Sequence, residues 1–193
     1  MATLTVTHTS MESRTSDDST WRDRSADYAG TYSSTRYKYS SSAFNFTGTA
    51  SKIVFTLPYN DNSSTSFQTS LYVGPTSIGA VSTIPSNATK IGTFPATIGD
   101  STASGTLTLT ITNASTINTF LNAIATNPCI YIYGSNNTTG QTIECKSTFS
   151  ITITYSTTTM YVYSGGWKAV TPYVYTSSGW KEATPSVYSG GWG

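Results

Sequence analysis

The sequence predicts a mainly β protein: an antiparallel, jelly-roll-like β-sandwich with one short helix at about residues 115–126 and aromatic β-hairpin repeats at its C-terminal end. Three observations lead to this prediction. Ser and Thr make up 68 of the 193 residues, aromatic residues reach 13%, and charged residues only 10%. Thr, Tyr, Val and Ile favour pleated, half-buried strands. Several segments also alternate between apolar and polar residues, which is the period of a strand with one wet face.

The clearest strand covers residues 106–112, where aliphatic residues alternate with threonines. Four further segments rich in β-branched and aromatic residues also read as strands: 52–59, 67–73, 91–98 and 151–155. Pro95 interrupts one of these segments, which indicates an edge strand or a bulge. Clusters of Asn, Asp, Ser and Gly separate the strands as turns do. We therefore expect residues 51–160 to form the sandwich.

The helix is predicted by one apolar stripe at the spacing i, i+3, i+4, i+7: Ile117, Phe120, Leu121 and Ile124. Ser115 can cap its first turn. Asn127-Pro128 ends it, because the residue before a proline avoids the helical conformation. We expect this helix to cover one open end of the sandwich, and a partner-binding helix is the alternative.

Residues 1–50 contain an opening strand and a charged, Ser-rich segment. Ten of the 19 charged residues lie between Glu12 and Lys38, with mixed signs. One interpretation is a solvated loop with weak surface ion pairs. The other is a contact to a neighbouring subunit, in which charges set the register. The segment is thus either part of the body or an assembly contact, before the sandwich at 51–160 and the repeats at 161–193.

The two cysteines flank a turn-rich loop centred on residue 137, which is also midway between Cys129 and Cys145. A symmetric hairpin would place the two residues opposite each other, close enough for a disulfide. A protein that folds in the cytoplasm keeps such thiols reduced. We therefore expect free, buried cysteines, with the pair Cys129–Cys145 as the alternative.

Little in the composition suggests catalysis or a cofactor. His8 is the only histidine, and the formal net charge is +1. A nucleic-acid surface needs clustered Lys and Arg, and a membrane-spanning helix needs a long apolar run that this chain lacks. The first residues alternate as a strand and do not resemble a signal peptide. We expect no enzyme activity, metal, cofactor, nucleic acid or membrane partner, and no signal peptide.

The last 33 residues repeat a hairpin unit three times, at 161–172, 173–185 and 186–193. A two-residue turn in the first copy would pair Tyr163 with Lys168. A three-residue turn in the second would pair Tyr175 with Lys181, with the tryptophans on the opposite face. The aromatic residues of the repeats are either interface anchors or platforms for glycan stacking: Tyr161, Tyr163, Trp167, Tyr173, Tyr175, Trp180, Tyr188 and Trp192.

The motif Tyr-Val-Tyr-x-Gly-Gly-Trp-Lys resembles the C-terminal repeats of bacteriophage tail and minor structural proteins. This resemblance implies a virion surface protein of the tail tip, baseplate or fibre, which folds in the host cytoplasm and is released by lysis. Its implied partners are other copies of itself, other virion proteins and host cell-wall polysaccharide. The alternatives are a stand-alone carbohydrate-binding module or adhesin domain, and a capsid decoration or head-fibre protein. Choline-binding repeats also combine Gly-Trp with aromatic hairpins, but their spacing differs.

Overall fold

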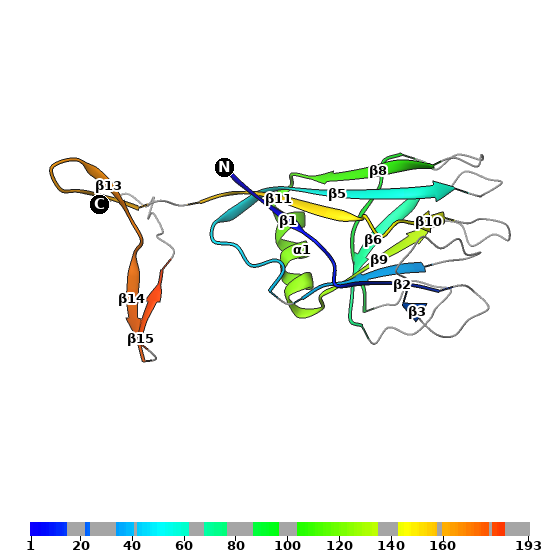
Figure 1. The fold of residues 1–193 in the computed structure, drawn as a ribbon, viewed down its shortest axis with the longest axis horizontal. Helices are drawn as coiled ribbons and strands as arrows, with labels where there is room; N and C mark the ends of the chain where they lie inside the picture. Colours follow the sequence, from blue (N-terminus) through cyan, green and yellow to red (C-terminus); the bar gives the residue numbers. More distant parts are fainter. Residues whose placement is uncertain are drawn as a thin grey trace.

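The computed structural model describes residues 1–14, 22–23, 34–40, 42–61, 68–76, 87–96, 104–134, 143–157, 160–177 and 179–183. Two antiparallel β-sheets pack face to face, with one helix at one end of the sandwich (Figure 1). Two small hairpins follow the sandwich in the chain and are drawn beyond that end (Figure 1). The predicted mainly β sandwich with one short helix is thus confirmed.

The first sheet is organised by its longest strand, β5. Five strands form this sheet: β1 (Ala2–Val6), β5 (Thr49–Asp61), β8 (Ser104–Ile111), β10 (Ile143–Cys145) and β11 (Ser150–Ser156). One edge of β5 pairs with β11 and then with β10, and its other edge pairs with β8. The alternation predicted for β8 is observed, since Leu107, Leu109 and Ile111 are buried between exposed threonines.

The second sheet runs in the order β3-β2-β4-β9-β6-β7. Its strands are β2 (Ser10–Arg14), β3 (Arg22–Asp23), β4 (Ser34–Lys38), β6 (Thr69–Val73), β7 (Thr89–Thr93) and β9 (Cys129–Gly134). Strand β7 lies at the sheet edge, and its pairing with β6 shifts register between Leu71 and Tyr72. This agrees with the edge strand or bulge expected there. Strands β2 and β4 bring part of the charged segment into the sheet.

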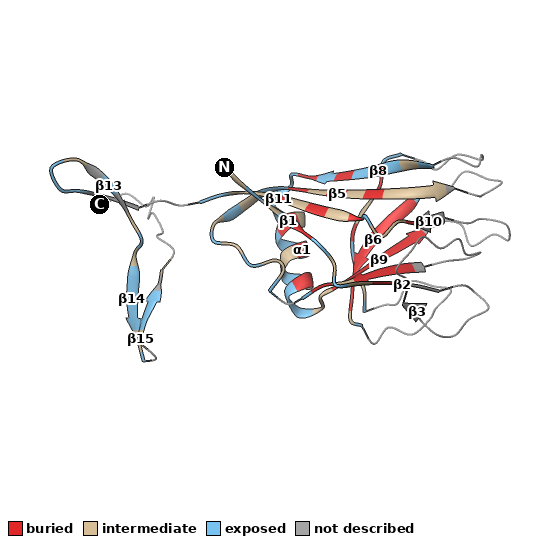
Figure 2. Ribbon diagram, viewed as in Figure 1, coloured by how far each residue is buried: buried red, intermediate tan, exposed pale blue. Residues whose placement is uncertain are grey.

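The core lies between the two sheets (Figure 2). Each sheet contributes the residues at alternate positions of its strands, such as Phe55 from β5 and Tyr37 from β4, both fully buried. The Tyr37 ring stacks on Phe149 with centroids 4.5 Å apart, and its hydroxyl donates a hydrogen bond to the Lys146 carbonyl at 2.9 Å. This buried tyrosine thus joins the two sheets by both packing and a satisfied polar contact.

Helix α1 (Ala114–Thr126) buries Ile117, Phe120 and Ile124 against the open end of the sandwich. Its cap is Asn113, whose side chain accepts a hydrogen bond from the Thr116 amide at 3.1 Å. The predicted cap at Ser115 is therefore wrong by two residues. Asn is as good a cap as Ser, and the side chain that reaches the free amide decides between them.

Candidate binding surface in the C-terminal hairpins

The tail contains two hairpins built on the same plan. The first pairs β12 (Met160–Tyr163) with β13 (Trp167–Val170), and the second pairs β14 (Tyr173–Thr176) with β15 (Gly179–Glu182). A backbone hydrogen bond from the Ala183 amide to the Pro172 carbonyl, 2.9 Å long, closes the base of the second hairpin. The predicted hairpin repeats are thus observed for the first two copies.

The register differs from the predicted one by one residue in each hairpin. Tyr163 pairs with Trp167 and Tyr175 with Trp180, so the predicted Tyr–Lys pairs are wrong. The reason is turn length. The first turn has three residues, 164–166, and the second has two, 177–178, which reverses the expected assignment. Because cross-strand partners share a face, the tyrosine and the tryptophan of each hairpin belong to one face and not to opposite faces.

The second hairpin presents a face of exposed rings. Tyr173, Tyr175 and Trp180 are 58%, 68% and 71% exposed, and Tyr163 of the first hairpin is 71% exposed. The Tyr175 and Trp180 rings meet edge to face with centroids 5.4 Å apart. This contact sets the two rings at an interplanar angle of 68°, yet leaves most of their surface open to solvent.

The predicted aromatic residues are not all described to the same depth. Tyr161 and Trp167 lie in the strands of the first hairpin, and for these two residues the structure describes the backbone register but not the side chain. Tyr188 and Trp192 of the third copy lie outside the described residues. The structure therefore brings together Tyr173, Tyr175 and Trp180 as the ring face of the second hairpin.

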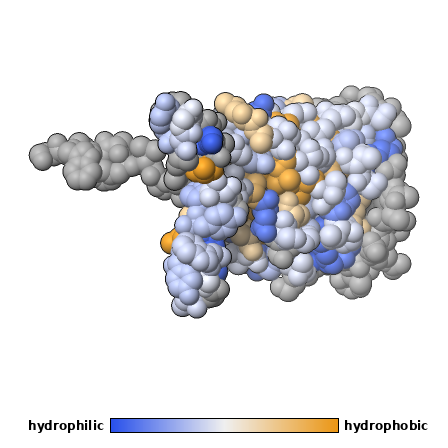
Figure 3. Space-filling model, turned by 60° about the vertical axis from the view of Figure 1, so that its left-hand side comes forward, coloured by the Kyte–Doolittle hydropathy of each residue, from blue (hydrophilic) through white to orange (hydrophobic). Residues whose placement is uncertain are grey.

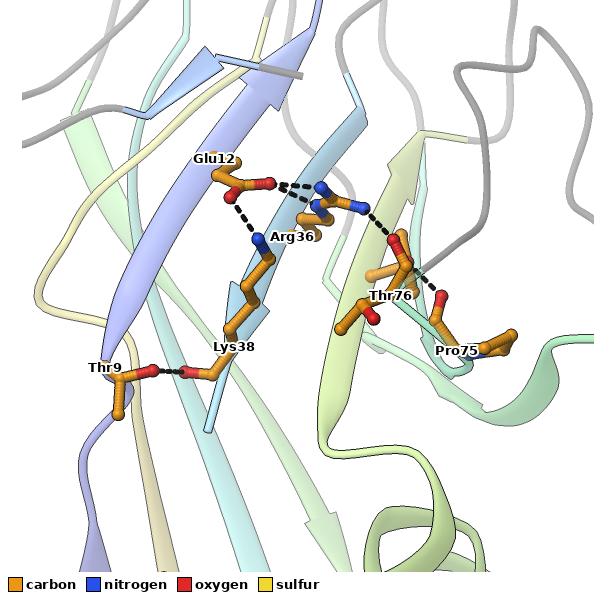
Figure 4. A network of polar contacts seen from close by, with 7 residues as sticks. Thr9, Glu12, Arg36, Lys38, Pro75 and Thr76 are labelled. Atoms are coloured by element: carbon orange, nitrogen blue, oxygen red, sulfur yellow. Dashed lines mark hydrogen bonds and ion pairs between the residues drawn. The ribbon is translucent and has the colours of Figure 1, made fainter. Parts of the chain in front are cut away.

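A second polar feature lies on the outer side of the six-stranded sheet (Figure 4). Glu12 of β2 accepts hydrogen bonds from Arg36 and Lys38 of β4, as ion pairs. Arg36 also donates to the Thr76 carbonyl at 2.7 Å, which ties the segment that follows β6 to the sheet. Arg36 is only 6% exposed. The interpretation of these charges as a solvated loop is therefore wrong for this cluster.

Electrostatics in this cluster favour the ionised carboxylate. Burial alone would raise the pKa of Glu12, but hydrogen bonds from Lys38 and Arg36 and their positive charges outweigh it, so the pKa lies below its ordinary value. Glu12 and Arg36 are direct cross-strand partners. The sequence indicates that both residues point outward, because each lies in a short segment that alternates between polar and apolar residues. Only the register of β2 and β4 shows that they meet.

Tyrosines extend this outer surface toward β6. The Tyr131 hydroxyl donates to the Pro75 carbonyl at 2.6 Å, and the Tyr72 and Tyr133 rings lie edge to face at 5.8 Å. These rings are at most 8% exposed. Because these three rings are buried, this surface supports the fold and is not the exposed binding face.

The cysteines lie in different sheets. Strand β9, with Cys129, pairs with β4 and β6, whereas β10, with Cys145, pairs with β5. The predicted symmetric hairpin between them is wrong, because each strand finds its partners far away in the sequence. Both cysteines are buried and neither forms a disulfide, as expected. The pair Cys129–Cys145 is therefore not formed.

We expect both thiols to resist labelling in the native protein. Burial raises the pKa of Cys129 to about 11, so almost no thiolate is present at pH 8, and the thiolate is the reactive form. Treatment with a thiol reagent at pH 8 should modify neither cysteine before unfolding and two per chain in denaturant. Rapid native labelling counted by mass spectrometry would contradict the burial of these residues.

Two further features concern only the described part of the chain. No three His, Cys, Asp or Glu side chains gather there as a metal-binding group. The helix found there is too short to cross a membrane.

The surface around the hairpins has mostly the pale colours of weakly polar residues, with saturated blue in scattered places (Figure 3).

Comparisons with known proteins give a structural likeness but no family. No family model matches the chain, and no curated protein matches it. Its fold is similar to that of a xylan-binding module CBM15, with a TM-score of 0.40 and 13% identity, over 81% of this chain and 97% of the module. We carry no residue and no ligand over from this module.

Proposed function

We propose that this chain is a non-enzymatic binding protein that holds polysaccharide against the ring face of its tail hairpins. The observation that carries the proposal is the set of three rings on one face of the second hairpin, each more than half exposed. Aromatic side chains are normally used to bury large areas. A face that leaves such rings in water has unused capacity to bind.

The chemistry of this face suits a sugar. A ring offers a flat apolar surface with negative potential, which complements the C–H groups on one side of a pyranose. Tyr hydroxyl and Trp N–H groups add hydrogen bonds at the ring edges. Lys168, Lys181 and Glu182 are the only charged residues from 160 to 193, a net charge of +1 (two positive minus one negative). A neutral polymer therefore fits better than a polyanion.

Packing within the hairpin is the competing explanation for these rings. The Tyr175–Trp180 contact does stabilise the hairpin, as cross-strand pairs do, by about 0.2–1 kcal/mol. That role requires the two rings to touch, but does not account for the Tyr173 ring, which is 58% exposed on the same strand. Ligand binding explains all three rings together.

A second proposal concerns the setting in which the chain works. The repeat motif resembles phage tail proteins, which favours a bacteriophage surface protein whose body assembles with copies of itself and whose tail contacts the host wall. The uncharged, Thr-lined outer face of β8 suits close packing of identical subunits. Sedimentation velocity separates the two settings: a defined ring or trimer supports the virion protein, and a stable monomer supports a stand-alone module.

Replacing Trp180 with alanine should lower polysaccharide binding at least about tenfold, because central aromatic anchors carry most of the energy of such contacts. Depletion from suspensions of purified bacterial cell walls, and binding to a polysaccharide array, measure the effect. Val174→Ala is the matched control, since Val174 is also exposed but occupies the other face of the same hairpin. Trp180→Phe keeps a ring and should retain most of the binding.

Two results would count against the proposed function. One is that the unaltered chain binds neither the walls nor any polysaccharide on the array. The other is that Trp180→Ala binds as well as the unaltered chain, which would place the binding surface elsewhere.

A further inference from the structure

We infer that the hairpins are equivalent copies of one weak site, so that the tail recognises a polysaccharide by its repetition. It should hold long polymer chains firmly and their isolated fragments only weakly. This inference rests on the proposed function and specifies its ligand: a neutral polymer with several accessible units in a row.

The first step is the equivalence of the two hairpins. Each contains a Tyr–Trp pair, Tyr163 with Trp167 and Tyr175 with Trp180, and the next position inward is in both a Val–Lys pair. Three residues lie between the tyrosine and the tryptophan in the first copy and four in the second, yet the two residues pair in both hairpins. A slip of one residue would have moved the tryptophan to the other face. The structure therefore repeats the backbone pairing of tyrosine with tryptophan, and not only the order of the residues in the sequence.

The second step is that the turn of each hairpin is set by its own residues. Gly165 and Gly179 have φ of 67° and 102°, values that favour glycine. A Cβ atom placed on either would meet nothing within 4 Å. In the second turn the Thr176 hydroxyl donates to the Gly179 carbonyl at 2.9 Å. Among the described residues, glycine at these positions is thus required by the backbone conformation and not by a packed neighbour.

The third step is energetic. A face of two or three rings on an open hairpin contacts one or two sugar units, and a contact of that size binds weakly on its own. Sites linked on one chain raise each other's effective concentration, so the combined affinity can exceed a single one by about 10²–10⁴-fold. The sequence carries a third copy, with Tyr188 and Trp192 spaced as Tyr163 and Trp167 are. Repetition of the site is useful only against a repeating ligand.

The experiment compares Trp167→Ala, Trp180→Ala and the double variant in the full chain. The probes are purified bacterial cell walls and the soluble glycan fragments that a muramidase releases from the same walls. On walls, each single variant should bind at least about tenfold more weakly, and the double variant more weakly still. On fragments, each single variant should keep the affinity of the unaltered chain but bind one fragment fewer per chain in calorimetric titration. Unchanged thermal unfolding of the body serves as the folding control.

The inference that the hairpins are equivalent sites is wrong if Trp167→Ala binds walls as tightly as the unaltered chain while Trp180→Ala does not, or if fragments bind as tightly as intact walls. Those results leave the proposed function intact, because binding still depends on a ring of the tail. Failure of the proposed function looks different: the double variant then binds walls as well as the unaltered chain does. If Trp180→Ala instead dissociates an oligomer while wall binding persists, the ring face binds a second copy of the chain. The inference that the hairpins are equivalent polysaccharide sites is then wrong.

Discussion

Replacing Glu12 with glutamine is expected to lower the free energy of unfolding by about 3 kcal/mol. The change leaves the Arg36 guanidinium, 6% exposed, and the Lys38 ammonium without their counter-charge. It also loosens the arginine that holds the Thr76 carbonyl. Removing the negative charge from a buried ion pair is costly, so the loss should exceed that of a surface ion pair. Urea denaturation at pH 7 measures it.

Controls for this prediction use charges elsewhere and a paired change. Lys52→Gln removes an exposed charge and should change stability by less than about 0.5 kcal/mol. The double variant Glu12→Gln with Arg36→Met removes the buried cation too, and should be more stable than Glu12→Gln alone. A loss below about 1 kcal/mol for Glu12→Gln would show that water reaches the cluster freely.

The same cluster sets a pH dependence with a definite sign. The pKa of Glu12 in the folded protein lies below its ordinary value of 4.5. The folded state therefore binds the proton less readily than the unfolded chain. The contribution to stability is complete above the ordinary value and is lost as the pH falls through the lowered one. Below pH 4.5 the unaltered chain should lose stability more steeply than Glu12→Gln.

Truncation of Phe120 to alanine should cost about 4 kcal/mol. Phe120 is fully buried and meets Phe55 and Phe44 edge to face, at centroid distances of 5.1 and 5.7 Å. It is thus the residue through which α1 joins the strand β5 and the segment before it. Removing the ring leaves a cavity at the end of the sandwich and takes away both aromatic contacts. Thermal or urea unfolding, monitored by the far-UV circular dichroism of the backbone, measures the loss.

A matched ring in the tail provides the control for Phe120. Tyr175→Ala removes a ring that is 68% exposed and should leave the unfolding of the sandwich unchanged within about 0.5 kcal/mol. Asn118→Ala tests the exposed side of the same helix and should have an equally small effect. If Phe120→Ala cost no more than Asn118→Ala, the helix would not be packed on the sandwich as described.

The strands and the helix were predictable because their signals are local. The alternation of residues 106–112 follows from one buried face, and the stripe Ile117, Phe120 and Ile124 follows from one helix face. Each of these patterns is contained within a short stretch of sequence, so it can be recognised without knowing which strand or helix packs against it. The sandwich class follows from the number and spacing of such strands.

Features that depend on distant partners could not be predicted in this way. Symmetry around residue 137 suggested that Cys129 faces Cys145, but β9 and β10 pair in different sheets. Nothing local reports that choice. The Glu12–Arg36 contact depends on the β2–β4 register, across a segment of 21 residues from 13 to 33 in which no periodic signal stands out. The sequence therefore shows the charged residues but does not predict that they are buried.

The tail shows an intermediate case. The repeats were predictable, and so was the same pairing in both copies although the second copy is one residue longer. The assignment of turn lengths was not predictable. Gly-Gly suggested a two-residue turn at 165–166, whereas the first turn has three residues and the second has two. Since neighbours alternate between faces, this one-residue difference decides whether tyrosine meets lysine or tryptophan, and hence whether the ring face exists.

The two ends of the sandwich chain lie side by side, with mechanical consequences. Ala2 of β1 pairs with Tyr155 near the end of β11, from which the tail continues (Figure 1). Hydrogen bonds between antiparallel strands run across the strands. Tension between the N-terminus and a ligand-bound tail would therefore separate β1 from β11 by breaking their hydrogen bonds one after another, starting at Ala2 and Tyr155. Anchorage through the opposite end of β5 would instead load β11 lengthwise, so that many bonds resist together.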